Sequence, residues 1–203
     1  MKRILLSLLM LTVLLAGCNK DDDISSRQEL INGYVAVDLG LPSGLKWATC
    51  NVGASSSVDY GKYYCWAKVN DKIYTYANYT KGIDYDFSGN PDYDVAANKW
   101  GASWRTPTSG EMLELIKFCE WSWTAIDGVS GYKVVGTNGN YIFLPAAGYR
   151  YEEEYFSKGK DVCYTTSTPN GSYVYSLWMD CEDSIELGSW QGCYGRSVRP
   201  VSN

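Results

Sequence analysis

The sequence contains no histidine among its 203 residues. Histidine is the side chain whose unperturbed pKa lies nearest neutrality, so its absence removes the usual general base of enzymes. The absence also excludes Ser–His and Cys–His nucleophile pairs and every metal site that needs an imidazole ligand. We expect a protein that is not an enzyme and that carries no cofactor, with calcium as the less favoured alternative.

The sequence also lacks a cluster of basic residues. It holds 18 Lys and Arg against 23 Asp and Glu, and its formal net charge is −5. Proteins that bind nucleic acids need a positive patch that neutralises phosphates. We therefore expect no nucleic acid among the partners.

No apolar run is long enough for a membrane-spanning helix. Lys2 and Arg3 precede an apolar stretch from Ile4 to Ala16, which is shorter than the roughly 20 residues that such a helix needs. Small residues then lead to Cys18. This order is typical of a bacterial lipoprotein signal peptide. We expect residues 1–17 to be removed and Cys18 to be lipidated, and an ordinary cleaved signal peptide is the alternative.

An acidic segment, Asn19–Asp23, follows Cys18 directly. A lysine followed by acidic residues at this place resembles the surface-export signal of Bacteroidetes-type lipoproteins. The resemblance implies a lipid anchor in the outer membrane, a protein that faces the cell exterior, and an acidic tether over residues 18–33. A solvated spacer is the alternative, because an acidic run alone does not distinguish the two.

Six cysteines remain when Cys18 is set aside. An even number in an exported chain indicates disulfide bonds, although six cysteines allow 15 connectivities. Free buried thiols are the alternative. The pairs that we expect are Cys181 with Cys193, Cys50 with Cys119, and Cys65 with Cys163.

Two helices are predicted among many short strands. Thr108 and Glu111 have the spacing of a capping box just after Pro107. An apolar face follows at helical spacing, and a shorter helix is expected over residues 95–100. The residues of the apolar face are Met112, Leu115, Ile116 and Cys119.

The second half of the chain is rich in extended segments, and Asn138-Gly139 is a strong hairpin signal. Helices among short, loop-rich strands predict an α+β fold with a mostly antiparallel sheet. The extended segments are expected at 34–38, 45–50, 63–67, 132–135, 141–144, 162–167, 172–179, 185–190 and 196–201.

Six blocks follow one another along the sequence in a recognisable order. They are Val37–Ala48, Cys50–Ala54, Tyr60–Tyr64, Trp100–Thr108, Phe143–Arg150 and Gly195–Val201. Together they resemble one family, the Fibrobacter succinogenes major paralogous (FISUMP) domain. The resemblance covers residues 34–201 and implies one domain over 34–203. It implies a C-type-lectin-like fold, related to sulfatase-modifying-factor domains, and no assigned biochemical role.

Two arginines in these blocks have an expected structural role. Arg105 stands between Trp104 and Pro107, just before the predicted helix. It is expected to donate to loop carbonyls or to pair with a carboxylate, and Arg199 to do the same near residue 200.

Two acidic stretches are weak candidates for chemistry. Asp84–Asp92 has the oxygen spacing of a calcium loop, with Gly89 at its sixth position, but Val95 occupies the twelfth position, where a glutamate is needed. Glu152–Glu154 is a carboxylate cluster of the kind used in acid–base catalysis. In both cases a solvated acidic turn is the simpler interpretation, and we expect no metal site.

Aromatic residues are abundant, with 18 Tyr and 8 Trp, and several gather within about 30 residues of the later strands. Aromatic rings beside hydrogen-bonding groups suit sugar rings and protein partners alike. We expect about half of these rings to lie in the core. The candidate ligand-binding residues are Tyr164, Tyr173, Tyr175, Trp178, Asp180, Trp190 and Tyr194.

The preferred hypothesis is a lipid-anchored, non-enzymatic binding module for a glycan or a protein. A structural component of a surface or fimbrial assembly is the alternative. An enzyme related to sulfatase-modifying factors ranks third.

Overall fold

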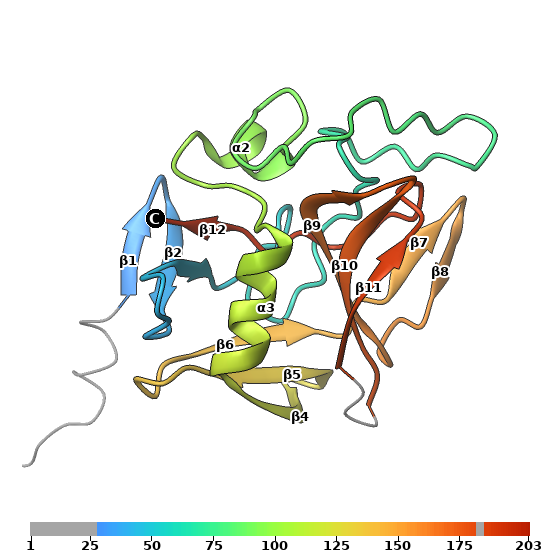
Figure 1. Cartoon of the computed structure of the whole chain (residues 1–203). Coiled ribbons are helices and arrows are strands. Elements are labelled where there is room, and N and C mark those ends of the chain that lie inside the picture. Colours follow the sequence, from blue (N-terminus) through green and yellow to red (C-terminus); the bar gives the residue numbers. More distant parts are fainter. Residues whose placement is uncertain (1–27, 182–184) are drawn as a thin grey trace, which may run out of the picture.

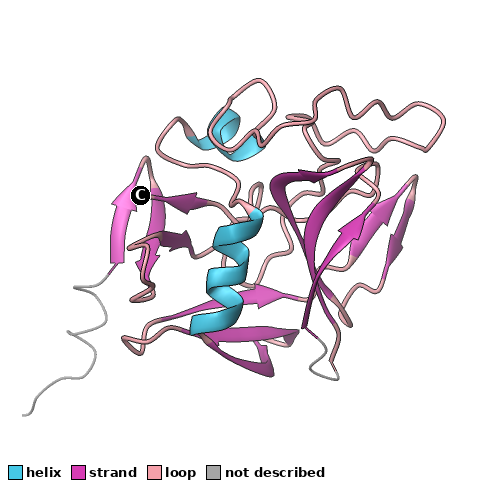
Figure 2. Cartoon of the chain, in the orientation of Figure 1, coloured by secondary structure: helices cyan, strands magenta, loops and turns pink. Residues whose placement is uncertain are grey.

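The computed structural model of the protein describes residues 28–181 and 185–203. The expected signal peptide, the lipidation site at Cys18 and most of the tether lie outside these residues. Within the described part, two helices lie among short strands that form four small sheets, and the strand pairing is antiparallel (Figures 1 and 2). The predicted α+β class, with two helices and mostly antiparallel strands, is confirmed.

The first sheet has the strand order β1-β2-β3-β12. Its strands are β1 (Gln28–Ile31), β2 (Tyr34–Asp38), β3 (Lys46–Ala48) and β12 (Val201–Ser202). Asn32 and Gly33 join β1 to β2 with φ values of 48° and 83°, as a tight hairpin turn requires. Residues 28–33, which we expected to belong to the tether, therefore form a strand and a turn of this sheet.

The second sheet has the order β4-β5-β6 and follows the longer helix. Its strands are β4 (Glu120–Ile126), β5 (Val129–Val135) and β6 (Tyr141–Pro145). The hairpin at Asn138-Gly139 forms as predicted between β5 and β6. Strand β4 was not predicted, although Asp127-Gly128, with φ values of 50° and 78°, carries the same kind of turn signal.

The later strands form a three-stranded sheet and a two-stranded ribbon. The sheet has the order β11-β10-β9, and the ribbon pairs β7 with β8. The bounds are β7 (Tyr149–Tyr151), β8 (Glu154–Phe156), β9 (Val162–Asn170), β10 (Tyr173–Met179) and β11 (Ile185–Trp190). The ribbon was not predicted, because its strands have only three residues each and the sequence at its turn, Glu152–Glu154, was interpreted as a solvated acidic turn.

Both predicted helices form. The short helix α2 (Val95–Trp100) begins where the Asp94 carboxylate accepts hydrogen bonds from backbone amides, and α3 (Ser109–Phe118) begins at the predicted capping box of Thr108 and Glu111. Helix α3 packs on the sheet β9–β11 and buries Met112 and Leu115 in the main core. In the described part of the chain neither helix is both long enough and apolar enough to cross a bilayer.

Arg199 is a buried charged residue whose side chain forms hydrogen bonds to several segments of the fold. It is fully buried and donates to Asn51 Oδ1 (2.9 Å), to the Ala48 and Thr49 carbonyls (both 3.1 Å) and to the Phe143 carbonyl (2.9 Å). Its four acceptors come from two distant parts of the chain. Arg199 therefore donates to one loop carbonyl, that of Thr49, as expected, and also to two strand carbonyls, those of Ala48 in β3 and Phe143 in β6.

The cysteines are not paired in the structure. All six described cysteines are free thiols, so none of the three expected disulfides is present. Cys50 packs against the core around Trp100 and Trp104, whereas Cys119 packs against the main core.

The other two expected pairs are also kept apart. Cys181 is exposed at the end of β10, while Cys193 is buried. The buried Cys65 donates its thiol to the Cys193 carbonyl at 2.9 Å and does not bond to Cys163.

Candidate functional site

The structure brings three of the seven predicted site residues together. Trp178 and Trp190 stack with ring centroids 4.2 Å apart, and Tyr194 joins them through Tyr149, whose ring lies 5.8 Å from Trp178 and 5.3 Å from Tyr194. These four rings are all partly exposed. They form the centre of the candidate site.

The other four predicted residues lie elsewhere. Tyr164 is fully buried in the main core, where its hydroxyl accepts a hydrogen bond from Asn51 at 3.0 Å. Tyr173 is exposed at the β9–β10 turn and Tyr175 is half-buried, and no ring contact among the described residues joins either to Trp178. Asp180 accepts a hydrogen bond from the Tyr132 hydroxyl on its backbone carbonyl. These four residues therefore lie outside the group of contacting rings, and Tyr164 is one of the aromatic residues that serve the core.

Three further rings complete what we call the aromatic cluster. Phe156 stacks on Tyr149 at 5.1 Å, Tyr151 lies 5.3 Å from Tyr194, and Tyr76 lies 5.8 Å from Tyr194. The aromatic cluster thus comprises Tyr76, Tyr149, Tyr151, Phe156, Trp178, Trp190 and Tyr194.

Strand alternation explains how the cluster is built. On β10, Leu177 and Met179 point into the main core, so Trp178 between them points to the opposite face. On the ribbon, Tyr149 is directly paired with Phe156, which places both on one face. The period-two spacing of Tyr149 and Tyr151 was a usable signal in the sequence. Tyr76, in the long loop over 68–93, gave none.

Gly188 has no side chain and so leaves room for the Glu186 carboxylate beside the Trp190 ring. A Cβ at Gly188 would lie 2.7 Å from Glu186 Oε1 and 3.1 Å from Trp190 Nε1. Both atoms therefore lie over the same face of β11. Trp190 Nε1 is buried without a hydrogen-bond partner in the described part of the chain, so a donor and a carboxylate accompany the rings.

Arg196 lies beneath the cluster. Its guanidinium is 5.8 Å from the Trp190 ring centroid and 5.6 Å from that of Tyr194, and it donates to the Gln191 carbonyl at 3.2 Å. No Asp or Glu of the described residues forms an ion pair with it. Burial lowers the pKa of Arg196. The rings above this cation gain a cation–π contribution.

Three thiols lie close enough to Arg196 to influence it electrostatically, namely Cys65, Cys163 and Cys193. Burial raises the pKa of Cys65 to about 11 and that of Cys163 to about 12, and it also raises that of Cys193. Thiols with such pKa values stay protonated at neutral pH and are poor nucleophiles. These three thiols therefore pack as small apolar side chains beneath the rings.

The two acidic stretches have local structural roles. Asp86 accepts hydrogen bonds from the Ser88 amide at 3.0 Å and from the Thr168 hydroxyl. Glu153 pairs with Arg150 at 3.0 Å while its side chain is 94% exposed. In residues 28–181 and 185–203, no three acidic or cysteine side chains gather as metal ligands would.

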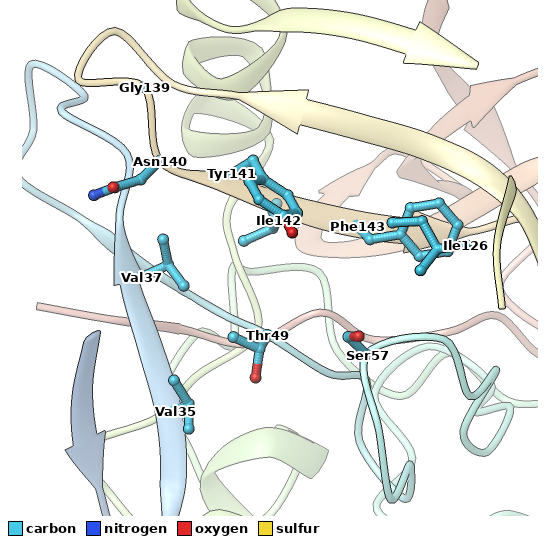
Figure 3. Close-up of a pocket in the computed structure, with 10 residues that line it drawn as sticks. All are labelled: Val35, Val37, Thr49, Ser57, Ile126, Gly139, Asn140, Tyr141, Ile142 and Phe143. Carbon is cyan, nitrogen blue, oxygen red and sulfur yellow. The ribbon is translucent and has the colours of Figure 1, made fainter. Parts of the chain in front are cut away.

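Apart from the aromatic cluster, a cavity of about 430 Å³ lies between the first and second sheets (Figure 3). Val35 and Val37 of β2 face Tyr141 and Ile142 of β6 across it. Thr49, Ser57, Asn140 and Tyr141 contribute its polar side chains, and none of its described lining residues is charged. The sequence did not indicate this groove, because its walls come from segments about 100 residues apart.

A comparison of the chain with protein-family models, with curated proteins and with solved structures finds no match. The resemblance to FISUMP domains and the C-type-lectin-like relationship therefore stay predictions. The site must be interpreted from its own chemistry.

Proposed function

We propose that this protein is a lipid-anchored, non-enzymatic binding module that holds a glycan against the aromatic cluster. The observation that supports the proposal is the unbroken run of ring contacts from Tyr76 to Trp190, in which every ring is partly exposed. Exposed aromatic patches of this kind usually mark binding sites, because leaving them in water is unfavourable.

The chemistry of the cluster favours a sugar. The apolar face of a sugar ring packs on Trp and Tyr rings, while its hydroxyls need donors and acceptors at the ring edges. Glu186 supplies an acceptor beside the stacked pair of Trp178 and Trp190. A flat protein surface is the second class of ligand that such aromatic anchors suit.

The proposal is tested with Trp178→Ala and Trp190→Ala on glycan and protein arrays and by titration calorimetry with the best hit. We expect each substitution to weaken binding at least tenfold. Tyr173→Ala is the matched control, because Tyr173 is an exposed aromatic of the same sheet outside the cluster. It should leave the affinity within twofold.

Two results would count against a glycan ligand. If the chain binds proteins saturably but binds no glycan, the ligand of the aromatic cluster is a protein. Stable co-purification with surface proteins, without any saturable ligand, would favour the structural alternative instead.

A further inference from the structure

The β7–β8 ribbon has a second face that the aromatic cluster does not use. Arg150 is directly paired with Tyr155, so both point away from Tyr149 and Phe156. On this side lies a pocket of about 270 Å³. Residues 59–63, Asp71 and Lys158 form its other walls.

The carboxylates of this pocket are already occupied. Asp59 accepts hydrogen bonds from the Ser55 amide (3.0 Å), the Ser55 hydroxyl (3.2 Å) and the Gly61 amide (3.1 Å). Asp71 pairs with Lys62 at 2.6 Å. These two acidic groups therefore serve the loop itself, and one of the three cations is neutralised.

The remaining two cations have unused donors. Arg150 Nε is buried and has no hydrogen-bond partner among the described residues, and the only carboxylate that Arg150 pairs with there is the largely exposed Glu153. Lys158 Nζ lies 4.8 Å from the Tyr60 ring centroid and 5.2 Å from that of Tyr155. No ion pair of Lys158 occurs in the described part of the chain.

Tyrosine rings stand beside these donors. Tyr155 is half exposed, and its ring lies 5.4 Å from the Arg150 guanidinium. Tyr63 meets that ring edge-on at 5.2 Å and is held by a hydrogen bond to the Ala147 carbonyl at 2.6 Å. The pocket thus combines a fixed aromatic wall with two cations, Arg150 and Lys158, and Lys158 also lies near enough to Asp59 to help lower the pKa of that carboxyl.

We infer that this pocket binds the carboxylate-bearing ring of an acidic sugar. The carboxylate accepts hydrogen bonds from Lys158 Nζ and from the partly exposed guanidinium of Arg150, and both bonds are charge-assisted. The ring packs on Tyr155, and the volume is close to the lower end of small-ligand sites, about 300 Å³. A neutral sugar would form no charge-assisted hydrogen bonds with these two cations and would gain less free energy on binding.

The test is a calorimetric titration of the full chain at low salt with sodium glucuronate, glucose and acetate. Glucuronate is expected to bind at least tenfold more tightly than either glucose or acetate. Equal affinity for glucose would overturn the role of the cations. Equal affinity for acetate would overturn the role of the ring.

Substitutions test whether glucuronate binds in this pocket. Lys158→Gln and Arg150→Met should each weaken glucuronate binding at least tenfold, whereas Lys160→Gln, an exposed lysine in the same loop, should change it less than twofold. Trp178→Ala should also change it less than twofold, because Trp178 lies on the other side of the ribbon. The inference fails if Lys158→Gln binds as the wild type does, or if Trp178→Ala abolishes binding. Thermal unfolding of each variant confirms that it is folded.

Discussion

Arg105 and Glu111 form a two-point ion pair that fastens the loop before α3 to the first turn of the helix. Arg105 Nη1 donates to Glu111 Oε2 at 2.8 Å, and Nη2 donates to Oε1 at 2.6 Å. The same carboxylate accepts a hydrogen bond from the Thr108 amide. Both side chains are about one-fifth exposed. Arg105 also pairs through its backbone with Val201, so this contact links α3 to β12.

Replacing Glu111 separates the two roles of its carboxylate. Glu111→Gln keeps a capping-box residue but removes the charge, and it should lower the free energy of unfolding by about 1–2 kcal/mol. Glu111→Ala removes the cap as well and should cost about 1 kcal/mol more. Urea unfolding of the three proteins measures both differences. Equal stability of the two variants would mean that the cap contributes nothing.

The same pair makes stability depend on pH. Burial acts to raise the pKa of Glu111, but the hydrogen bonds from Arg105 and Thr108 outweigh it and hold the pKa below the usual 4.5. The unfolded chain therefore binds a proton at a higher pH than the folded one. The stabilisation is complete above pH 4.5 and is lost as the pH falls through the lower, folded-state value.

Unfolding free energies measured between pH 6 and pH 3 should therefore converge for the wild type and Glu111→Gln on the acid side. Other carboxylates lower the stability of both proteins alike, so the difference between them is the informative quantity. A difference that stayed constant with pH would contradict the assignment.

The elements that were predicted correctly are those whose sequence signal lies within a few neighbouring residues. The Thr108–Glu111 capping box, the helix at 95–100 and the Asn138-Gly139 hairpin all lie within one turn or one hairpin. The hairpins at Asn32-Gly33 and Asp127-Gly128 had the same kind of signal and could have been predicted.

The rest depended on contacts that no local pattern records. Tyr164 and Trp178 look alike in the sequence, yet one is fully buried and the other joins the exposed cluster. The difference arises because β9 and β10 present alternate residues to a core that other segments complete. The three predicted disulfides are absent for the same reason, because the spacing of two cysteines in the sequence does not determine the distance between them in the fold.

Arg199 should be intolerant of substitution. Arg199→Met would leave the Asn51 side chain and the Ala48, Thr49 and Phe143 carbonyls without their donor, which we expect to cost more than about 4 kcal/mol. Arg199→Lys should also destabilise strongly, because an ammonium cannot reproduce the planar fork. Soluble yield and urea unfolding check both. A stable Arg199→Met protein would show that water replaces the guanidinium.

The thiols should react in an order set by burial. Cys181 is exposed, whereas Cys65, Cys163 and Cys193 are buried and their pKa values are raised. Iodoacetamide at neutral pH should label Cys181 first, and the buried three only after unfolding. Peptide mass spectrometry identifies the labelled positions. Recovery of an unlabelled, cross-linked Cys181–Cys193 peptide pair without reductant would restore the disulfide hypothesis.

Two glycines should respond differently to alanine. A Cβ at Gly131 would lie 2.3 Å from the Leu144 carbonyl oxygen, so β5 and β6 would have to separate. The three atoms nearest to a Cβ at Gly188 all belong to the side chains of Glu186 and Trp190, which can move. Gly131→Ala should lower the melting temperature by many degrees. Gly188→Ala should barely change it but should weaken ligand binding to the aromatic cluster.

The position of Arg199 has a consequence for how the chain acquires its structure. Its partners Asn51, Ala48 and Thr49 precede it by 148 to 151 residues, and β12 completes the sheet of β3 just after it. Closing so long a loop is entropically costly, and folds built on distant contacts form slowly. Folding therefore cannot finish until residues 196–202 have been synthesised. A chain interrupted before Arg196 should remain open and sensitive to proteases, however much of the aromatic surface it already contains.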